Sequence, residues 1–428
     1  MAPIRARAEA LLSSIEEVDA TLNCYVAIDR AAVLREADRL DALSPSERGP
    51  LHGRTLAVKD IIDVAGLPTR AGSSFYRRDP ERDAPVVAAL RAAGALVIGK
   101  TNTHEFAWGI TTENPHFGRT ANPWDPARSV GGSSGGSGAA VAAGLADIAL
   151  GSDTLGSIRL PAALNGISGI RPALDALSLD GVFPLAAGLD TVGPFARDLA
   201  TVQRVYEVLA GAPVRDVQVQ RVCRLRGGFW ERVEPAVLSA LDDAVAVLRA
   251  GGIIVDEIAW SDDALLPAIQ AVQAIAAADV HRALFAEHEA EYGEDVRGRV
   301  AGALAAGTAE ADAAREAIAF ARATFDAATR GYDGALAASA AGEAPRAPVP
   351  AEYRAETLPL MAPASGFGLA AVAVPIGFGS NGMPLGMQII APGEVAPAFA
   401  LGRRYQSVTS WHEARAPLAN GAAAASRS

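Results

Sequence analysis

The stretch from Arg128 to Pro172 constrains the fold most, because it holds two glycine-rich serine clusters separated by a small apolar segment. The clusters are residues 131–136 (GGSSGG) and 151–157 (GSDTLGS), and between them residues 139–144 (AAVAAG) are small enough to bury a helix against a sheet. Glycine at this density lets the backbone adopt positive φ and approach a ligand closely. We therefore expect both clusters to form turns around a site.

A lysine near these clusters in the fold would complete a catalytic group. Lys59 ends the segment 54–59 (RTLAVK), which has the pattern of a buried strand. Burial disfavours the charged form of a lysine, so its pKa falls toward neutrality. Together with Ser133 and Ser157, Lys59 supplies the groups of a serine hydrolase whose base is lysine rather than histidine.

The main rival interpretation is a nucleophile elbow, because residues 131–135 (GGSSG) fit the G-x-S-x-G pattern. Ser133 would then be the nucleophile of an α/β-hydrolase, with a later histidine as its base. The later histidines are His281, His288 and His412. The first two lie in a segment that looks helical and the third lies near the chain end, so we interpret all three as surface or half-buried residues.

Two other motifs, one for nucleotide binding and one for metal binding, are excluded because a required residue is missing. A P-loop needs a lysine after its second glycine, and Gly136 is followed by Ser137. The pair His104-Glu105 lacks the second histidine of an H-E-x-x-H zinc site. The sequence therefore predicts neither a metal nor an organic cofactor.

Composition limits the partners and the compartment. The net charge of −11, without a dense Lys/Arg stripe, disfavours nucleic acid or an anionic membrane as a partner. Cys24 and Cys223 lie far apart in the sequence, which argues for a reducing compartment and against a disulfide framework. No apolar run reaches the roughly 20 residues of a spanning helix. We expect a cytoplasmic protein.

The hydrophobic pattern predicts an α/β fold with a mostly parallel, mixed central sheet covered by helices on both faces. A strand at 54–59, a helix at 85–93 and a strand at 95–98 give a β–α–β rhythm. Further helices are predicted at 4–42 (interrupted at 22–26), 199–209, 235–250, 264–289 and 309–330, further strands at 148–150, 221–225, 252–255, 369–376 and 383–390, and a surface loop at 340–352.

The two serine clusters, taken with residues 139–144 and 158–172, strongly resemble the amidase signature family of Ser–cis-Ser–Lys amide hydrolases. Agreement extends well beyond the clusters, to residues 56–60 (LAVKD), 99–106 (GKTNTHEF), 112–114 (TEN), 122–125 (NPWD), 189–194 (LDTVGP) and 382–388 (GMPLGMQ). The resemblance implies the amidase-signature fold as a single domain over 1–428, divided into N-terminal helices (1–50), a catalytic core (51–200), a helical substrate-pocket region (200–330), C-terminal core strands and helix (355–415) and a disordered end (420–428).

Carried over by position, the resemblance makes Ser157 the nucleophile, Ser133 the bridging serine and Lys59 the base. It also implies a cis peptide bond between Gly132 and Ser133. Hydrolysis would proceed through an acyl-enzyme on Ser157.

The resemblance assigns supporting roles as well. An oxyanion hole would be formed by the backbone N–H groups of Thr154, Leu155, Gly156 and Ser157. Ser134 would orient Lys59, while Asp153 and Arg159 would form a structural ion pair beneath the loop.

Departures from the family pattern fall where substrate pockets are shaped. Leu155 stands where glycine is usual, and the stretches 173–176 and 337–341 and the residues Ser365 and Ala370 also differ. The expected substrate is a small amide. Residues 104–170 are similar to hydrolases of urea-type amides such as 1-carboxybiuret.

Alternatives within and outside the family stay open. One is a glutaminase subunit of the glutamyl-tRNA amidotransferase A type, and another is a binding or scaffold homologue without activity. A homodimer or a small accessory subunit is compatible with each of these alternatives.

Overall fold

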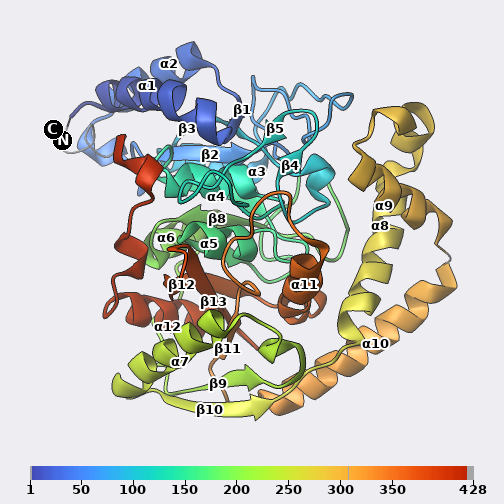
Figure 1. Ribbon diagram of the computed structural model, residues 1–428. Coiled ribbons are helices and arrows are strands. Elements are labelled where there is room, and N and C mark those ends of the chain that lie inside the picture. The colour runs from blue at the N-terminus through green and yellow to red at the C-terminus, as the bar shows by residue number, and fades with distance from the viewer. Residues whose placement is uncertain (1, 307, 422–428) are drawn as a thin grey trace.

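The structure, a computed structural model, describes residues 2–306 and 308–421 and is built around an 11-stranded sheet (Figure 1). The strand order is β1-β3-β2-β6-β8-β7-β12-β13-β11-β9-β10. Strands from the beginning, middle and end of the chain therefore share one sheet. The predicted mixed α/β class is confirmed.

The elements are bounded as follows. The helices are α1 (Ile4–Leu22), α2 (Arg30–Asp41), α3 (Pro85–Ala92), α4 (Gly135–Ala142), α5 (Arg159–Asn165), α6 (Leu199–Ala210), α7 (Pro235–Ala250), α8 (Leu265–His288), α9 (Glu294–Ala305), α10 (Thr308–Ala328), α11 (Ala351–Gly366) and α12 (Ala396–Gln406). The strands are β1 (Tyr25–Ala27), β2 (Thr55–Lys59), β3 (Leu96–Thr101), β4 (Glu113–Asn114), β5 (Gly118–Arg119), β6 (Ile148–Ser152), β7 (Ser168–Arg171), β8 (Val192–Ala196), β9 (Arg221–Arg226), β10 (Ile254–Ala259), β11 (Ala335–Ala338), β12 (Ala371–Phe378) and β13 (Pro384–Ile390).

Parallel pairing forms two runs in the sheet, with antiparallel strands between them. One run is β3-β2-β6 and the other is β11-β9-β10. The strands β8, β7, β12 and β13 pair antiparallel with their neighbours in the centre. The first parallel run matters for the site, because the carboxyl ends of β2 and β6 lie at the same edge of the sheet.

Side chains alternate between two hydrophobic cores on the two faces of the sheet, as the period of a strand requires. On β2, Leu56 and Val58 face the core that contains buried residues of α3, α6 and α7. Ala57 faces the other core, with α1, α2 and the alanines of α4. The alanines at this second face let α4 pack close to the sheet and fix the turn that precedes it.

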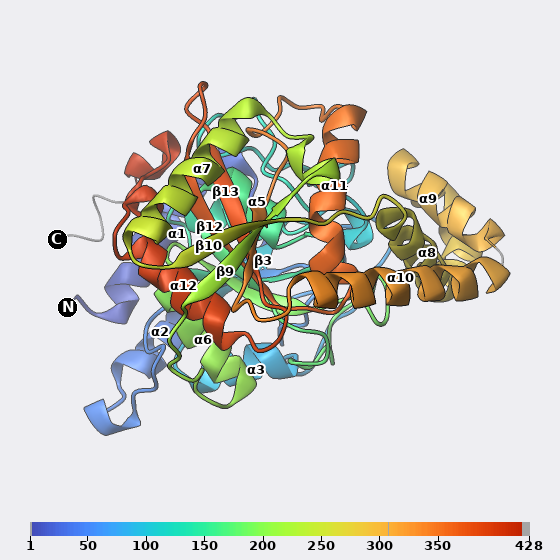
Figure 2. The same ribbon diagram turned by 90° about the horizontal axis from the view of Figure 1, so that it is seen from below.

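The helices α8, α9 and α10 project together from one side of the molecule (Figures 1 and 2). This arrangement confirms the predicted helices at 264–289 and 309–330. One end of α8 packs against α11, which connects the projecting helices to the part of the molecule beside the sheet. In the described residues, none of the helices combines the length and apolarity that crossing a membrane requires.

One predicted segment is corrected by the structure. The expected surface loop at 340–352 is buried over its first part, where Ala340, Ala341, Glu343 and Ala344 are at most 5% exposed. The Glu343 carboxylate accepts hydrogen bonds from the Asn381 and Met383 backbone N–H groups in the β12–β13 turn, which holds this segment inside. Of the end predicted to be disordered (420–428), residues 422–428 lie outside the described residues.

Candidate active site

The catalytic candidates meet at the carboxyl ends of two parallel strands. Lys59 is the last residue of β2, and the second serine cluster begins with the last two residues of β6 and continues beyond its end. Ser133 lies just before α4, which packs on the same strands. Ligands of α/β sheets bind preferentially outside the carboxyl ends of strands, and this edge fits that rule.

Lys59 lies fully buried between two serine hydroxyl groups. Its Nζ donates hydrogen bonds to Ser133 Oγ at 2.7 Å and to Ser152 Oγ at 2.8 Å. Burial lowers the pKa of Lys59 to about 7, against the opposing influence of the Asp190 and Asp153 carboxylates. A large fraction of the amine is therefore neutral at physiological pH and able to accept a proton.

The backbone around Ser133 is fixed by hydrogen bonds and by close packing. The Gly132–Ser133 peptide bond is cis, as the resemblance implied. The Ser133 carbonyl accepts hydrogen bonds from Thr103 Oγ1 at 2.9 Å and from the His104 N–H at 3.2 Å. A Cβ at Gly132 would lie 2.6 Å from the Thr111 backbone nitrogen, so only glycine fits there.

Ser157 stands beside this pair at the edge of a pocket. It is 6% exposed, whereas Lys59 and Ser133 are fully buried. Its carbonyl accepts a hydrogen bond from the Ser134 N–H at 3.4 Å, which ties the two serine turns together. Among the described residues, no hydrogen bond joins Ser157 Oγ to Ser133 Oγ. The structure therefore contains the lysine–serine contact and places the second serine next to it.

The position of Ser134 differs from the sequence prediction. Its hydroxyl group donates to the Ser152 carbonyl at 3.1 Å and accepts from the Ser152 N–H at 3.2 Å, so it contacts the end of β6. Within the described part of the chain, no hydrogen bond links it to Lys59. The second side chain that holds Lys59, besides Ser133, is Ser152, which sequence reasoning did not single out.

One of the four predicted oxyanion donors has another partner. The Gly156 N–H donates to Asp153 Oδ1 at 2.8 Å. By contrast, no hydrogen bond of the described residues uses the N–H groups of Thr154, Leu155 or Ser157. Three backbone donors therefore remain near Ser157 for a developing oxyanion.

Asp153 and Arg159 meet in a buried ion pair that includes a third residue. The two Asp153 oxygens each lie 3.0 Å from an Arg159 nitrogen, and Arg171 Nη1 lies 3.2 Å from Asp153 Oδ1. Burial alone would raise the pKa of Asp153, but the two guanidinium groups hold it well below its ordinary value. Sequence reasoning did not identify Arg171, whose signal was its place in the motif GIRP.

A narrow pocket of about 30 Å³ opens beside Ser157. Its apolar lining includes Trp108 and Leu155, and its polar lining includes Gln273 of α8 and Arg354 of α11. Leu155, which replaces the usual glycine, is therefore a wall residue. One water molecule needs roughly 10–15 Å³ of such space, so the pocket suits a small substrate group.

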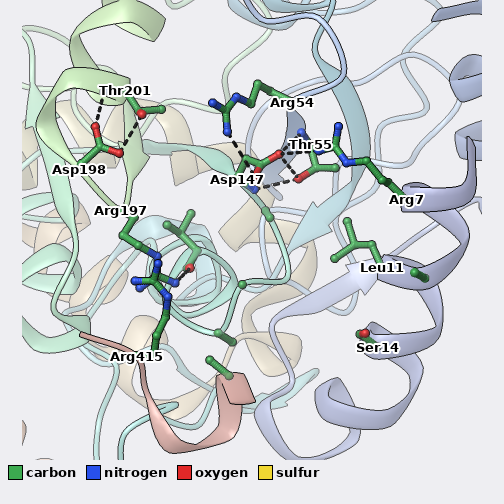
Figure 3. Close-up of a pocket in the computed structure, with 16 residues that line it drawn as sticks. Arg7, Leu11, Ser14, Arg54, Thr55, Asp147, Arg197, Asp198, Thr201 and Arg415 are labelled. Atoms are coloured by element: carbon green, nitrogen blue, oxygen red, sulfur yellow. Dashed lines mark hydrogen bonds and ion pairs between the residues drawn. The ribbon is translucent and has the colours of Figure 1, made fainter. Parts of the chain in front are cut away.

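A larger cavity of about 350 Å³ lies at the opposite ends of β2 and β6 (Figure 3). It is lined by Thr55 at the start of β2, by Asp147 just before β6, and by arginines that include Arg197 and Arg415. Its lining contains none of the predicted catalytic residues. The smaller pocket at the carboxyl ends of the strands, by contrast, is lined by Ser157.

The histidines of the rival interpretation are used elsewhere. His281 is fully buried in α8, which corrects the expectation of a surface or half-buried residue, and its Nδ1 lies 3.0 Å from the Tyr292 hydroxyl. His288 pairs with Glu291. In the described residues, neither of them nor His412 forms a hydrogen bond with Ser133 or Ser157. The described residues also contain no group of three or more His, Cys, Asp or Glu side chains arranged to hold a metal ion.

Comparisons with known proteins find relatives over nearly the whole chain. The family model described as Amidase matches residues 7–394. The A subunit of glutamyl-tRNA(Gln) amidotransferase from Symbiobacterium thermophilum is 34% identical over 465 residues, covering 96% of this chain and 94% of that protein. A crystal structure of an amidase has a TM-score of 0.88 at 34% identity, covering 94% of this chain and 96% of that one. A chain from a vestigial complex that reveals the evolutionary origins of an s-triazine catabolic enzyme has a TM-score of 0.87 at 29% identity, covering 95% of each chain.

Proposed function

Because the chain belongs to the Amidase family of amide C–N hydrolases, we propose that it cleaves a small amide through an acyl-enzyme on Ser157. Lys59 is the base of this proposal and Ser133 is the bridging serine. The observation that carries it is the buried contact of 2.7 Å between Lys59 Nζ and Ser133 Oγ, with a lysine pKa of about 7.

Acylation begins with the neutral amine of Lys59. It accepts a proton from Ser133 as Ser133 accepts one from Ser157, and Ser157 Oγ attacks the amide carbonyl. Negative charge develops on the carbonyl oxygen, where the N–H groups of Thr154, Leu155 and Ser157 stabilise it. The proton then returns through Ser133 to the leaving nitrogen, and the C–N bond breaks to release an amine or ammonia.

Deacylation repeats the same route with water. A water molecule loses a proton to the serine–lysine pair and attacks the ester, and the acid leaves as Ser157 regains its proton. The scheme requires Ser157 Oγ to turn toward Ser133 Oγ when the substrate binds. Catalytic hydrogen bonds are often long or poorly aligned until that stage.

Covalent labelling tests the nucleophile and the base together. A small fluorophosphonate should modify Ser157, as mass spectrometry of the digested protein would show, and Ser157→Ala should not be labelled. Lys59→Ala should slow labelling and hydrolysis by about 10²- to 10⁴-fold, the usual contribution of a general base. Ser137→Ala is the matched control, because this buried serine contacts Thr101 and the Leu150 carbonyl rather than Lys59. Full activity in Lys59→Ala would overturn the assignment.

Two substrate assignments compete. A urea-type amide such as 1-carboxybiuret is supported by the likeness of residues 104–170 to such hydrolases and by the similarity to a protein connected with s-triazine catabolism. A glutaminase subunit that passes ammonia to a partner is supported by the curated relatives, which are A subunits of amidotransferases.

The purified chain alone distinguishes these assignments. Turnover of ureido amides without a partner, faster than turnover of glutamine, supports the first. Glutamine hydrolysis that is weak alone and rises when the other subunits of an amidotransferase are added supports the second.

We also propose a cellular compartment for the protein. Cys24 and Cys223 are both buried and free. Free thiols fit a reducing environment such as the cytoplasm.

A further inference from the structure

The pocket beside Ser157 contains polar side chains that no described residue uses. Its walls are largely apolar, with Trp108, Leu155 and Leu358 among them. Arg354 and Gln273 line the same pocket, and in the described part of the chain neither side chain takes part in a hydrogen bond or an ion pair. Gln273 is 7% exposed and Arg354 is half-buried, so both side chains are only partly accessible to solvent. Their polar ends are therefore free to bind a group that enters the pocket.

The charged groups around Arg354 do not include a carboxylate that pairs with it. Its neighbour Arg299 donates to both oxygens of Asp295, at 2.6 and 2.7 Å, and also to the Trp108 carbonyl. His104 Nε2 lies 3.3 Å from the same carboxylate. Asp295 is therefore occupied by Arg299 and His104, and the half-buried Arg354 has no carboxylate of its own among the described residues.

The pKa of Arg354 reflects the same charged neighbours. Burial and the nearby Arg299 together lower the pKa of Arg354 to about 10, and Asp295 opposes them. The side chain remains positively charged at neutral pH. A cation held in a partly desolvated pocket without a counter-ion favours an incoming anion.

We propose that Arg354 binds a carboxylate of the substrate, so that the enzyme acts on small amides that carry one negative charge. This inference rests on the proposed amidase function and specifies its substrate class. A guanidinium group presents two parallel N–H donors that match the two oxygens of a carboxylate. Gln273 offers a further amide donor in the same pocket, and the small volume favours a short spacer between the carboxylate and the amide that reaches Ser157.

The test compares two amides of matched length, succinamate with a carboxylate and butanamide without one. Binding is measured by calorimetry in the Ser157→Ala protein, where no turnover occurs. Succinamate should bind more tightly than butanamide, and adding Arg354→Gln should weaken succinamate binding by about 100-fold, as expected when one partner of a buried charged pair is removed. Arg354→Lys should restore part of this loss, because it keeps the charge but not the two-pronged geometry.

The control is Arg315→Gln, which removes an exposed arginine paired with Asp312 on α10 and should leave the preference unchanged. With Ser157 intact, the ratio of kcat/KM for succinamate over butanamide should fall in Arg354→Gln by a similar factor. Equal binding of the two amides, no binding of either, or a preference that survives Arg354→Gln would each overturn the carboxylate site. Selective binding by the Ser157→Ala protein without labelling or turnover in the intact protein would instead reject the proposed chemistry and leave the carboxylate site standing.

Discussion

The protonation of Lys59 determines the pH range in which the proposed nucleophile works. Burial lowers the pKa of this amine to about 7, and only its neutral form can accept a proton. The neutral fraction grows as pH rises, so kcat/KM for a neutral amide should increase about tenfold per pH unit below pH 6 and level off above pH 8. Initial rates between pH 5.5 and 9 measure this profile. A flat profile would contradict the role of Lys59 as base.

Ser152 is a positioning residue in this scheme, because it holds Lys59 Nζ at 2.8 Å. Ser152→Ala should lower kcat by about tenfold with little change in KM. Its hydroxyl oxygen accepts from the ammonium and so favours the charged form, and its removal should shift the pH profile toward lower pH. Ser137→Ala, at a buried serine that contacts Thr101 and not Lys59, should leave the profile where it is. An unchanged profile in Ser152→Ala would assign this serine a purely structural role.

At the residue scale, the sequence identified side chains in recognisable motifs and missed those defined by packing. Lys59, Ser133 and Ser157 stand in segments with unusual glycine content or a charged end to a buried strand. Ser152 and Arg171 gain their roles from contacts between segments that are separate in the sequence. Ser152 of β6 accepts a hydrogen bond from Lys59 of β2, and Arg171 forms an ion pair with Asp153. The occupied Gly156 N–H could not be foreseen either, since a carboxylate three residues away takes it.

The helix α4 supports the site through a contact that only glycine allows. A Cβ at Gly136 would lie 2.5 Å from the Asn102 carbonyl oxygen and 2.8 Å from the Cys24 carbonyl oxygen, both rigid backbone atoms. Gly136→Ala should therefore push α4 away from the end of β3 and displace the preceding Ser133. We expect a loss of about 1–3 kcal/mol in the free energy of unfolding, measured in urea, together with a fall in kcat/KM.

The matched control is Gly298→Ala in α9, where an added Cβ has no atom within 4 Å. Alanine there should stabilise the helix by up to about 1 kcal/mol, because it is the better helix former. Wild-type stability in Gly136→Ala would contradict the close packing inferred for α4.

At the scale of elements, predictions succeeded where local signals and tertiary structure agree. The helix α7 begins at Pro235 and ends before Gly251, as predicted, and the strands predicted at 369–376 and 383–390 pair as β12 and β13 around an Asn-Gly turn. Other elements carry contrary local signals. The helix α11 contains Pro359 and Pro363, the strand β11 is rich in alanine, and β8 contains glycine and proline. Their neighbours in the sheet and core determine their conformation.

At the scale of the whole molecule, the site depends on segments that are far apart in the chain. Lys59, Ser133 and Ser157 come from the first half, whereas Arg354 and Gln273 of the pocket come from helices in the second half. The reacting groups sit on the sheet, and the pocket wall is supplied by α8 and α11. This division explains why the chemistry was readable from motifs, while the proposed carboxylate site required the folded structure.

The stability of the whole molecule should decrease in mild acid, and a buried histidine of α8 should contribute to this decrease. Burial lowers the pKa of His281 to about 4, below its ordinary value of 6.5. Between pH 6.5 and pH 4 the unfolded chain binds a proton at this position and the folded protein does not, so falling pH favours unfolding. The shift corresponds to about 3 kcal/mol, lost progressively across this interval. Urea unfolding at pH 7.5, 6 and 5 measures the change in free energy.

His281→Phe provides the comparison, because His281 lies among the aromatic rings of Phe106, Phe183 and Tyr292 and a phenyl ring matches that environment. Its Nε2 has no hydrogen-bond partner among the described residues, so the substitution removes only the hydrogen bond between Nδ1 and the Tyr292 hydroxyl. The variant should be less dependent on pH between 6.5 and 5 than the wild type. If both proteins became less stable by the same amount over this interval, groups other than His281 would account for the acid sensitivity, such as His104, whose pKa burial also lowers.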